Sequence, residues 1–332
     1  MQRKIRWGIL GCGRIARKFA LDLKLVDNAE LIAVGSRSID NANTFAKDFP
    51  VLYTHGSYES LVQNELVDII YIATPHSEHY QNTLLCLQHG KAVLCEKAFA
   101  VNSRQAQEMI NLAREKKVFL MEAVWTKFLP QYQKLQSILR EGLLGDIKAV
   151  QINFGFRPQE PIPARMYHPA LAGGSLLDIG IYNVFMALSI LGKPDHIDAW
   201  MTPAHTGVDE QCAVLFRYNN VAMAQLFSSF ATHMPTEVEI CGINGRIRLT
   251  HRFYSPDTIM EYYSGLPDSR EIVHVEKEAG HGYQHEARHV CECLQQGLTE
   301  SPVMTHADSL LLMEMLDTIR KKAGIKYAVD EQ

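Results

Sequence analysis

The chain has 332 residues, of which 47% are hydrophobic and 21% charged, a composition typical of a globular protein with about two domains. A net charge of -4 without any basic block argues against nucleic acid and membrane surfaces as partners. No run of about 18 apolar residues occurs, so we expect no membrane-spanning helix. The seven cysteines show no framework spacing, which indicates free thiols and a cytoplasmic protein.

Short apolar runs alternate with helical patterns from the N-terminus to Met121. The runs are Ile5–Leu10, Leu31–Gly35, Ile69–Ala73, Ala92–Cys95 and Val118–Met121. The helical patterns between them are Arg14–Lys24, Asn41–Asp48, Ser57–Asn64, Tyr80–His89 and Ser103–Lys116. Apolar strands that alternate with helices predict a parallel sheet covered on both faces, which is a doubly wound Rossmann domain. We assign residues 1–123 to this domain.

The second part of the chain, residues 124–332, changes to an α+β pattern. Helices are expected at Leu129–Glu141, Leu176–Leu191, Gln284–Gln296 and Ala307–Ala323, and a Pro-rich loop at Arg157–Pro169. Strands are expected at Ile147–Phe156, Ile197–Met201, Gln211–Tyr218, Val221–Ser229, Glu237–Cys241, Arg246–Thr250, Ile259–Tyr263 and Glu271–Val275. Short turns between strands predict an open, mostly antiparallel sheet of roughly six strands. The last helix can pack back on the first domain.

The first strand is followed by the pattern G-x-G-x-x-A, formed by Gly11, Gly13 and Ala16. Between a strand and a helix, this pattern predicts a dinucleotide-binding turn, because glycine permits the close approach of a pyrophosphate to free N–H groups at the helix start. We expect the cofactor to contact Gly11, Cys12, Gly13, Arg14 and Ile15.

The end of the second strand indicates which dinucleotide binds. An NAD enzyme usually has a carboxylate there for the ribose hydroxyls, whereas this chain has Gly35, Ser36 and Arg37. Ser36 can donate to a 2′-phosphate, and Arg37 can pair with it and stack on adenine. The sequence therefore favours NADP(H), and an exposed Arg37 with dual specificity for NAD is the alternative.

Two later loops follow strands at the same carboxyl edge of the sheet, where ligands bind. Thr74, Pro75 and His76 are expected to line the ribose and nicotinamide, whereas His79 is favoured as a structural residue at a helix start. The strand Ala92–Cys95 ends in Glu96 and Lys97, an acid and a base at the mouth of the sheet.

The order of these motifs, followed by "GGSLLDIGIY" at 173–182, resembles the glucose–fructose oxidoreductase/inositol dehydrogenase (Gfo/Idh/MocA) family over nearly the whole chain. Within that family, "VLCEK", "FLMEAVWTKFLP" and "GSLLDIGIY" resemble the dihydrodiol dehydrogenase group. The family implies a Rossmann domain and a second domain with an open sheet. The family pattern has Pro after the lysine where this chain has Ala98. We therefore expect Lys97–Ala98 to be either a trans bond in a shifted loop or a cis bond held by packing.

The resemblance also implies residue roles. Lys97 would contact the nicotinamide ribose and the substrate hydroxyl, with Glu96 holding its loop, and Asp178 and Tyr182 would act in the pocket. Their i, i+4 spacing puts Asp178 and Tyr182 on one helix face. The substrate pocket would consist of Trp125, Phe154, Arg165, Asp178 and Tyr182, with Trp125 also near the cofactor.

The implied reaction is a hydride transfer between NADP(H) and a hydroxyl-bearing carbon of a sugar, a polyol or a trans-dihydrodiol. Tyr182 is the expected general acid/base, because a neighbouring ammonium such as Lys97 lowers the pKa of a tyrosine, which is normally near 10. The alternatives are an NAD-linked inositol or other sugar dehydrogenase, a non-catalytic dinucleotide sensor, and a glycosidase that uses NAD transiently. The open sheet leaves one face to cover, which predicts a homodimer through that sheet.

Two metal-like patterns are better explained without a metal. His285, Glu286 and His289 form H-E-x-x-H, but no third ligand stands in a matching context, although His281 lies one turn upstream. Cys291 and Cys293 are two apart on a helical pattern and therefore point in different directions. We expect no metal site.

Overall fold

The computed structural model describes residues 3–265 and 269–331 and divides into two compact units. The first unit combines Met1–Phe128 with Glu278–Leu311, and the second combines Leu129–Lys277 with Leu312–Gln332. Each unit is thus built from two separate segments of the chain. The expected border at 123/124 stays a sequence-based prediction, and the segment 278–311 groups with the first unit.

The first unit contains a parallel sheet of six strands in the order β3-β2-β1-β4-β5-β6. Its strands are β1 (Ile5–Leu10), β2 (Ala29–Gly35), β3 (Tyr53–His55), β4 (Ile69–Ile72), β5 (Ala92–Glu96) and β6 (Leu120–Ala123). The doubly wound order is confirmed, with β1 and β4 at the point where the direction of winding reverses. The sequence missed β3, because this edge strand is only three residues long and is not fully buried.

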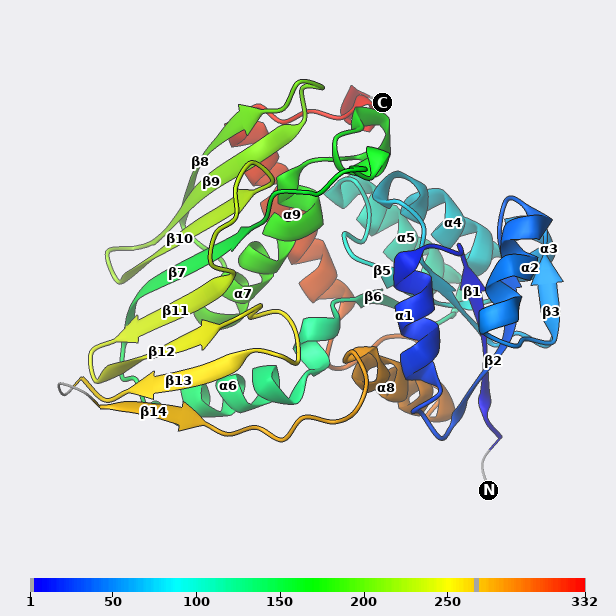
Figure 1. Cartoon of the computed structure of the whole chain (residues 1–332), viewed down its shortest axis with the longest axis horizontal. Helices are drawn as coiled ribbons and strands as arrows, with labels where there is room; N and C mark the ends of the chain where they lie inside the picture. The colour runs from blue at the N-terminus through cyan, green and yellow to red at the C-terminus, as the bar shows by residue number, and fades with distance from the viewer. Residues whose placement is uncertain (1–2, 266–268, 332) are drawn as a thin grey trace. The chain divides into compact units, whose positions relative to one another are not determined.

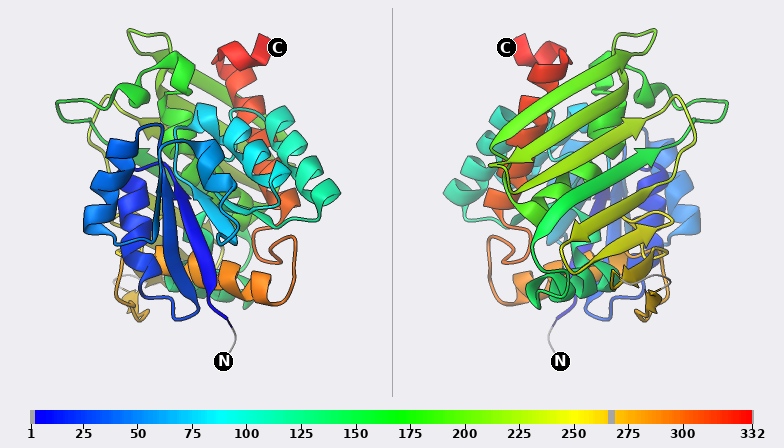
Figure 2. Two further views of the ribbon diagram at one scale, coloured as in Figure 1. Left: turned by 90° about the vertical axis from the view of Figure 1, so that its right-hand side faces the viewer. Right: turned by 90° about the vertical axis from the view of Figure 1, so that its left-hand side faces the viewer.

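Helices lie on either side of this sheet (Figure 2, left). They are α1 (Arg14–Leu23), α2 (Ile39–Asp48), α3 (Tyr58–Val62), α4 (His76–Gln88), α5 (Ser103–Lys116), the short turn η1 (Trp125–Phe128) and α8 (Tyr283–Gln295). Asp22 of α1 holds the start of α8, since its carboxylate accepts the backbone N–H groups of His281 and Tyr283 at 2.9 Å. This remote cap attaches a late segment of the chain to the dinucleotide-binding unit.

The second unit contains an eight-stranded sheet in the order β14-β13-β12-β11-β7-β10-β9-β8 (Figure 1). Its strands are β7 (Ile147–Gly155), β8 (His196–Pro203), β9 (Asp209–Tyr218), β10 (Ala222–Ser229), β11 (Glu237–Gly242), β12 (Gly245–Thr250), β13 (Ile259–Tyr263) and β14 (Arg270–Val273). The mostly antiparallel sheet is confirmed; β7 and β10 pair in parallel. The expected number of about six strands is wrong, because the edge strands β8 and β14 also join the sheet.

One face of this sheet is covered by α7, which packs on β7 and β10. The helical segments associated with the second unit are α6 (Pro130–Arg140), η2 (Ala164–Met166), η3 (Pro169–Leu171), η4 (Leu176–Gly180), α7 (Ile181–Leu191), η5 (Ala328–Glu331) and the part of α9 (His306–Ala323) from Leu312 onward. No described helix lies in front of β7–β10 on the opposite face (Figure 2, right).

One helical stretch, Pro169–Leu191, is long and apolar enough to cross a membrane by length and composition. This corrects the expectation from the sequence, which considered only uninterrupted apolar runs. However, 78% of its apolar window is buried inside the protein, and it carries the polar Asp178. Burial of this extent is that of a core helix.

Candidate active site

The glycine turn of the first unit is shaped for the close approach of a ligand. Gly11 has φ +102°, and a Cβ there would lie 3.0 Å from the carbonyl oxygen of Ala73. Gly13 is the N-cap of α1, where no side chain caps the helix, so the first N–H groups are open to an anion. Ala16 is completely buried, as close packing of helix and strand requires. These residues fit a dinucleotide pyrophosphate.

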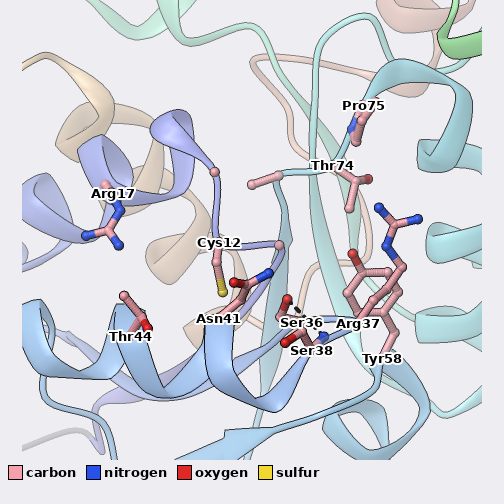
Figure 3. A pocket seen from close by; sticks show the side chains of 13 residues that line it. Cys12, Arg17, Ser36, Arg37, Ser38, Asn41, Thr44, Tyr58, Thr74 and Pro75 are labelled. Carbon is pink, nitrogen blue, oxygen red and sulfur yellow. Dashed lines mark hydrogen bonds between the residues drawn. The ribbon is translucent and has the colours of Figure 1, made fainter. Parts of the chain in front are cut away.

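A cavity of about 560 Å³ opens at this turn (Figure 3). Its lining includes the predicted residues Gly11, Cys12, Gly13, Ser36, Arg37, Thr74 and Pro75. It also includes residues that the sequence did not single out: Arg17, Ser38, Asn41, Thr44, Tyr58 and Ala73. Ser38, Asn41 and Thr44 recur every third residue, which is a helix-face signal that could have been found. Tyr58 carried no such signal.

The polar end of the cavity lies at the start of α2. Ser36 is buried, and Arg37 and Tyr58 lie side by side (Figure 3). Burial raises the pKa of Tyr58, and the Arg37 guanidinium partly offsets this rise. No acidic side chain is among the described residues that line the cavity. Arg14 and Ile15 belong to the first turn of α1 beside this cavity, although neither is part of its lining.

His79 connects two loops at the carboxyl edge of the sheet. Its Nδ1 lies 2.7 Å from the Ala98 carbonyl oxygen and its Nε2 2.9 Å from that of Thr74. Burial lowers the pKa of His79 to about 4 despite these acceptors, so the ring is neutral at pH 7 and donates to one of them. His76 is buried, and its ring meets that of His79 edge-on at 5.7 Å.

The Lys97–Ala98 peptide bond is cis, which is the second of the two expected alternatives. Ala98 and Phe99 are fully buried, in agreement with a turn held by packing. Glu96, just before the lysine, accepts a hydrogen bond from the buried hydroxyl of Tyr71 on β4. Glu96 is thus tied to the neighbouring strand.

Two further buried carboxyls belong to the same unit. Glu122 accepts the N–H of Phe99 at 3.0 Å, and burial raises the pKa of Glu122 to about 7. Glu286 is completely buried, and burial together with the nearby Glu96 and Asp22 raises the pKa of Glu286 well above its ordinary value.

Glu286 is the glutamate of the H-E-x-x-H pattern. The second histidine of this pattern, His289, hydrogen-bonds to Ser301, with 2.7 Å between its Nε2 and Ser301 Oγ. Among the described residues, no group of His, Cys, Asp and Glu could hold a metal ion.

We expect Glu122→Gln to change how stability depends on pH. A folded-state pKa above the unfolded value of 4.5 gives stability that is present below pH 4.5 and lost as the pH rises through about 7. The Gln variant lacks this loss. Its free energy of unfolding, relative to that of the native protein, should therefore increase by on the order of 3 kcal/mol between pH 4 and pH 8. Thermal unfolding of both proteins across this range measures the gain, and parallel curves would contradict the buried, raised carboxyl.

Trp125 of the first unit stacks on Tyr283 with the ring centroids 4.5 Å apart and an interplanar angle of 11°. Lys97 and Trp125 belong to the first unit, whereas Phe154, Arg165, Asp178 and Tyr182 belong to the second. The pairing of Lys97 with Tyr182 therefore stays a prediction.

The second unit brings four predicted residues together in two pairs. Arg165 Nη1 lies 3.2 Å from Asp178 Oδ1. In this ion pair the arginine side chain is 38% exposed and the aspartate side chain 13%. The ring of Tyr182 lies 6.0 Å from that of Phe154. Tyr254, which the sequence did not single out, completes the aromatic cluster, since it stacks on Phe154 at 4.6 Å and lies 4.8 Å from Tyr182.

The helix that carries Asp178 and Tyr182 starts differently from the expected one. Leu176–Gly180 forms a π-helical turn, η4, and the α-helix begins only at Ile181. The α-helical i, i+4 spacing therefore does not apply at Asp178. Such π-turns occur frequently at functional sites. A Cβ at Gly180 would lie 3.0 Å from Ser228 Oγ, so this glycine lets the turn approach β10.

A unit whose glycine turn fits a dinucleotide and a unit that presents an acid and a tyrosine from the consecutive segments η4 and α7 are the parts of an NAD(P)-dependent oxidoreductase. Comparison of the sequence with the patterns of known protein families identifies the family. The pattern described as "Oxidoreductase family, NAD-binding Rossmann fold" matches residues 5–124, and that of the "GFO/IDH/MocA C-terminal domain" matches residues 132–248. The chain belongs to the GFO/IDH/MocA family and is an NAD(P)-dependent oxidoreductase.

Curated relatives match nearly the full chain. The chain is 36% identical over 334 residues to trans-1,2-dihydrobenzene-1,2-diol dehydrogenase of Sus scrofa, covering 98% of this chain and 99% of that one. The enzyme of the same name from Homo sapiens is 34% identical over 336 residues, with 99% of each chain covered.

A solved 3-ketoreductase from Actinomadura kijaniata, in complex with NADP and TDP-benzene, has a TM-score of 0.86 at 26% identity, covering 97% of this chain and 98% of the other. An aldose-aldose oxidoreductase from Caulobacter crescentus, complexed with glycerol, has a TM-score of 0.88 at 22% identity with the same coverage and shows the shared fold.

Proposed function

We propose that this protein uses NADP(H) to transfer hydride to or from a hydroxyl-bearing carbon of a sugar, a polyol or a trans-dihydrodiol. The observation that carries the proposal is the arrangement at the junction of η4 and α7 in the second unit. Asp178 of η4 is paired with Arg165, and Tyr182 at the start of α7 lies in the cluster of Phe154 and Tyr254. The relatives named as dihydrodiol dehydrogenases support it.

Each residue has a separate role in this proposal. When bound, the nicotinamide supplies or accepts the hydride. Tyr182 takes the proton from the substrate hydroxyl in oxidation and returns it in reduction. Lys97 keeps the tyrosine acidic enough for this task, and Asp178, oriented by Arg165, binds a substrate hydroxyl. The pairing of Lys97 with Tyr182 rests on the family resemblance.

The aromatic cluster favours substrates with one flat or apolar face. Phe154 and Tyr254 stack with an interplanar angle of only 13°. The ring faces that this stack does not cover suit the face of a pyranose or of an arene-derived diol, while Asp178 and Arg165 provide polar contacts for its hydroxyls. Trp125 is proposed as a further wall on the basis of the resemblance.

The test of this proposal is a panel of D-xylose, D-glucose, myo-inositol and a benzene dihydrodiol, each with NADP and with NAD, followed by the absorbance of the reduced cofactor. Turnover of a sugar or a dihydrodiol with NADP supports the proposal. Turnover of myo-inositol with NAD would replace it with the runner-up, an NAD-linked inositol dehydrogenase. Cofactor binding without any turnover would favour a dinucleotide sensor.

We propose NADP rather than NAD because Ser36 and Arg37 line the cavity at the start of α2, with no acid among its described lining residues. We expect Arg37→Ala to raise the KM for NADP about 10- to 100-fold with little change for NAD, since a charge-assisted contact with the 2′-phosphate is lost. The matched control is Lys47→Ala, which removes an exposed cation from the same helix, α2, without touching the cavity lining. Equal losses for both cofactors would contradict NADP selection by Arg37.

We propose a homodimer through the uncovered face of the eight-stranded sheet. Strand alternation directs Trp200, Leu215 and Met223 to this face, and Trp200 is 64% exposed. Exposed apolar side chains on a sheet face that no described helix covers (Figure 2, right) favour association with a second copy of the chain.

We expect Trp200→Asp to turn dimers into monomers in analytical ultracentrifugation, because it places an unpaired charge in the apolar part of this interface. Leu52→Asp is the control, since Leu52 is 71% exposed but belongs to the first unit. A Trp200→Asp protein that stays dimeric would rule out this face.

A cytoplasmic location is proposed on chemical grounds. All seven cysteines are free thiols, and burial raises the pKa of several of them, including Cys86 and Cys212. Free thiols in this number suit a reducing compartment.

A further inference from the structure

Gly173, the first residue of the double glycine before the catalytic helix, is enclosed by backbone. A Cβ at Gly173 would lie 2.7 to 2.8 Å from backbone atoms of Arg165, Met166 and His168. The N–H of Gly173 donates to the His168 carbonyl at 3.1 Å, and that of Gly174 donates to the Met166 carbonyl at 2.9 Å. The double-glycine loop, Gly173 to Ser175, thus fixes the segment that presents Arg165 to Asp178.

Asp209, the first residue of β9, holds the other end of this loop. Its Oδ2 accepts the N–H of Leu176 at 2.7 Å and the hydroxyl of Ser175 at 2.9 Å. Asp209 is fully buried, and these donors are the first groups of η4. A carboxylate that accepts the first N–H of a helix is a cap supplied from a distant strand. Asp178 lies two residues after Leu176, whose N–H group this cap accepts.

Tyr327, near the C-terminus, reaches the same loop. Its hydroxyl donates to the Gly173 carbonyl at 2.7 Å, and the residue is only 4% exposed. Burial is the largest cause that raises the pKa of Tyr327 well above its ordinary value, so the hydroxyl keeps its proton as a donor. The last residues of the chain therefore contact the loop that precedes Asp178 and Tyr182.

A buried guanidinium holds Tyr327 in place. Arg320 of α9 pairs with Asp317 at 2.6 Å and with Asp330 at 2.7 Å. The Arg320 guanidinium also lies 5.1 Å from the centre of the Tyr327 ring, and the Tyr327 N–H donates to Asp330 Oδ2 at 2.9 Å. The C-terminal segment is thus folded back on α9 so that one hydroxyl points to the loop.

We propose that Tyr327 and Asp209 are positioning residues that fix the double-glycine loop from two sides and thereby set the geometry of Asp178, Arg165 and Tyr182. This inference rests on the proposed function for the roles of Asp178 and Tyr182. The contacts themselves all lie within the second unit. A displacement of about 1 Å at such a loop is enough to reduce turnover strongly.

The test compares Tyr327→Phe with Tyr218→Phe. Tyr218 is a matched control, because its hydroxyl also donates to a glycine carbonyl, that of Gly192 at 3.1 Å, but at the opposite end of α7. For Tyr327→Phe we expect kcat to fall about tenfold on the best substrate of the panel, with the dissociation constant of NADP unchanged and a larger isotope effect with substrate deuterated at the reacting carbon. For Tyr218→Phe we expect similar thermal destabilisation and a kcat within about twofold of the native value.

Two further measurements keep the outcome clear. Hydrogen exchange over residues 170–180 should accelerate in Tyr327→Phe and in Asp209→Asn, a readout that needs no substrate, and remain unchanged in Tyr218→Phe. Native exchange and kcat in Tyr327→Phe would overturn the inference, as would equal losses of kcat in both tyrosine variants. If Tyr182→Phe is fully active, the proposed function fails instead; if Tyr182→Phe is inactive while Tyr327→Phe is native, the positioning role alone fails.

Discussion

Replacing Tyr182 by phenylalanine should reduce kcat about 1000-fold on the best substrate while the affinity for NADP stays native. The substitution removes one hydroxyl from the cluster with Phe154 and Tyr254 and leaves the ring contacts in place. General acid/base catalysis by a positioned side chain is worth about 100- to 10,000-fold, so the loss lies in the middle of that range. Stopped-flow absorbance of the reduced cofactor measures the chemical step directly.

The control for this experiment is again Tyr218→Phe. Tyr218 is 8% exposed and Tyr182 is 7% exposed, so both substitutions delete a hydroxyl from an equally buried tyrosine of the same unit. A loss confined to Tyr182→Phe identifies the chemical role of its hydroxyl. Lys97→Met should produce a loss of similar size, because it removes the cation that the mechanism requires. Full turnover in either catalytic variant would show that the proton is handled elsewhere.

The central strands of the first unit could be predicted from the sequence, whereas the grouping of the segment 278–311 with this unit could not. Its central strands are fully buried and therefore read as continuous apolar runs, as in β4 and β5. The glycine turn was equally visible, because Gly11 needs a positive φ that other residues rarely adopt. The edge strand β3 and the early start of α4 at His76 escaped prediction, since short or polar segments carry no clear periodicity.

The second unit shows where sequence reasoning ends. Asp178 and Arg165 could be singled out, but the π-turn that places Asp178 could not, because it depends on Gly180 approaching β10. Tyr254 lies in a loop about 100 residues after Phe154, and only the fold brings their rings together. Strand order and register decide which residues far apart in the chain come into contact. The alternation of apolar and polar residues along one strand does not reveal that order or register.

The substitution with the largest expected effect on stability is Gly174→Ala. Gly174 has φ +124°, and a Cβ there would lie 2.1 Å from Asp209 Oδ1. A contact this short is impossible, so either the loop or Asp209 must move, and the cap on Leu176 would be lost with it. Backbone strain and overpacking each cost about 1–3 kcal/mol, so we expect the free energy of unfolding to fall by about 3 kcal/mol or more.

Gly207→Ala separates the two causes. Gly207 also has a positive φ, +88°, but nothing lies within 4 Å of its virtual Cβ. This variant should lose only the backbone term, about 1 kcal/mol, and keep native kcat. Urea unfolding of both variants measures the difference, and kcat of Gly174→Ala at a temperature where it is folded shows whether the loop also positions the catalytic helix. Equal stability losses in the two variants would mean that Asp209 does not enclose Gly174 as the structure places it, since only Gly174 has a carboxylate in the space that a methyl group would occupy.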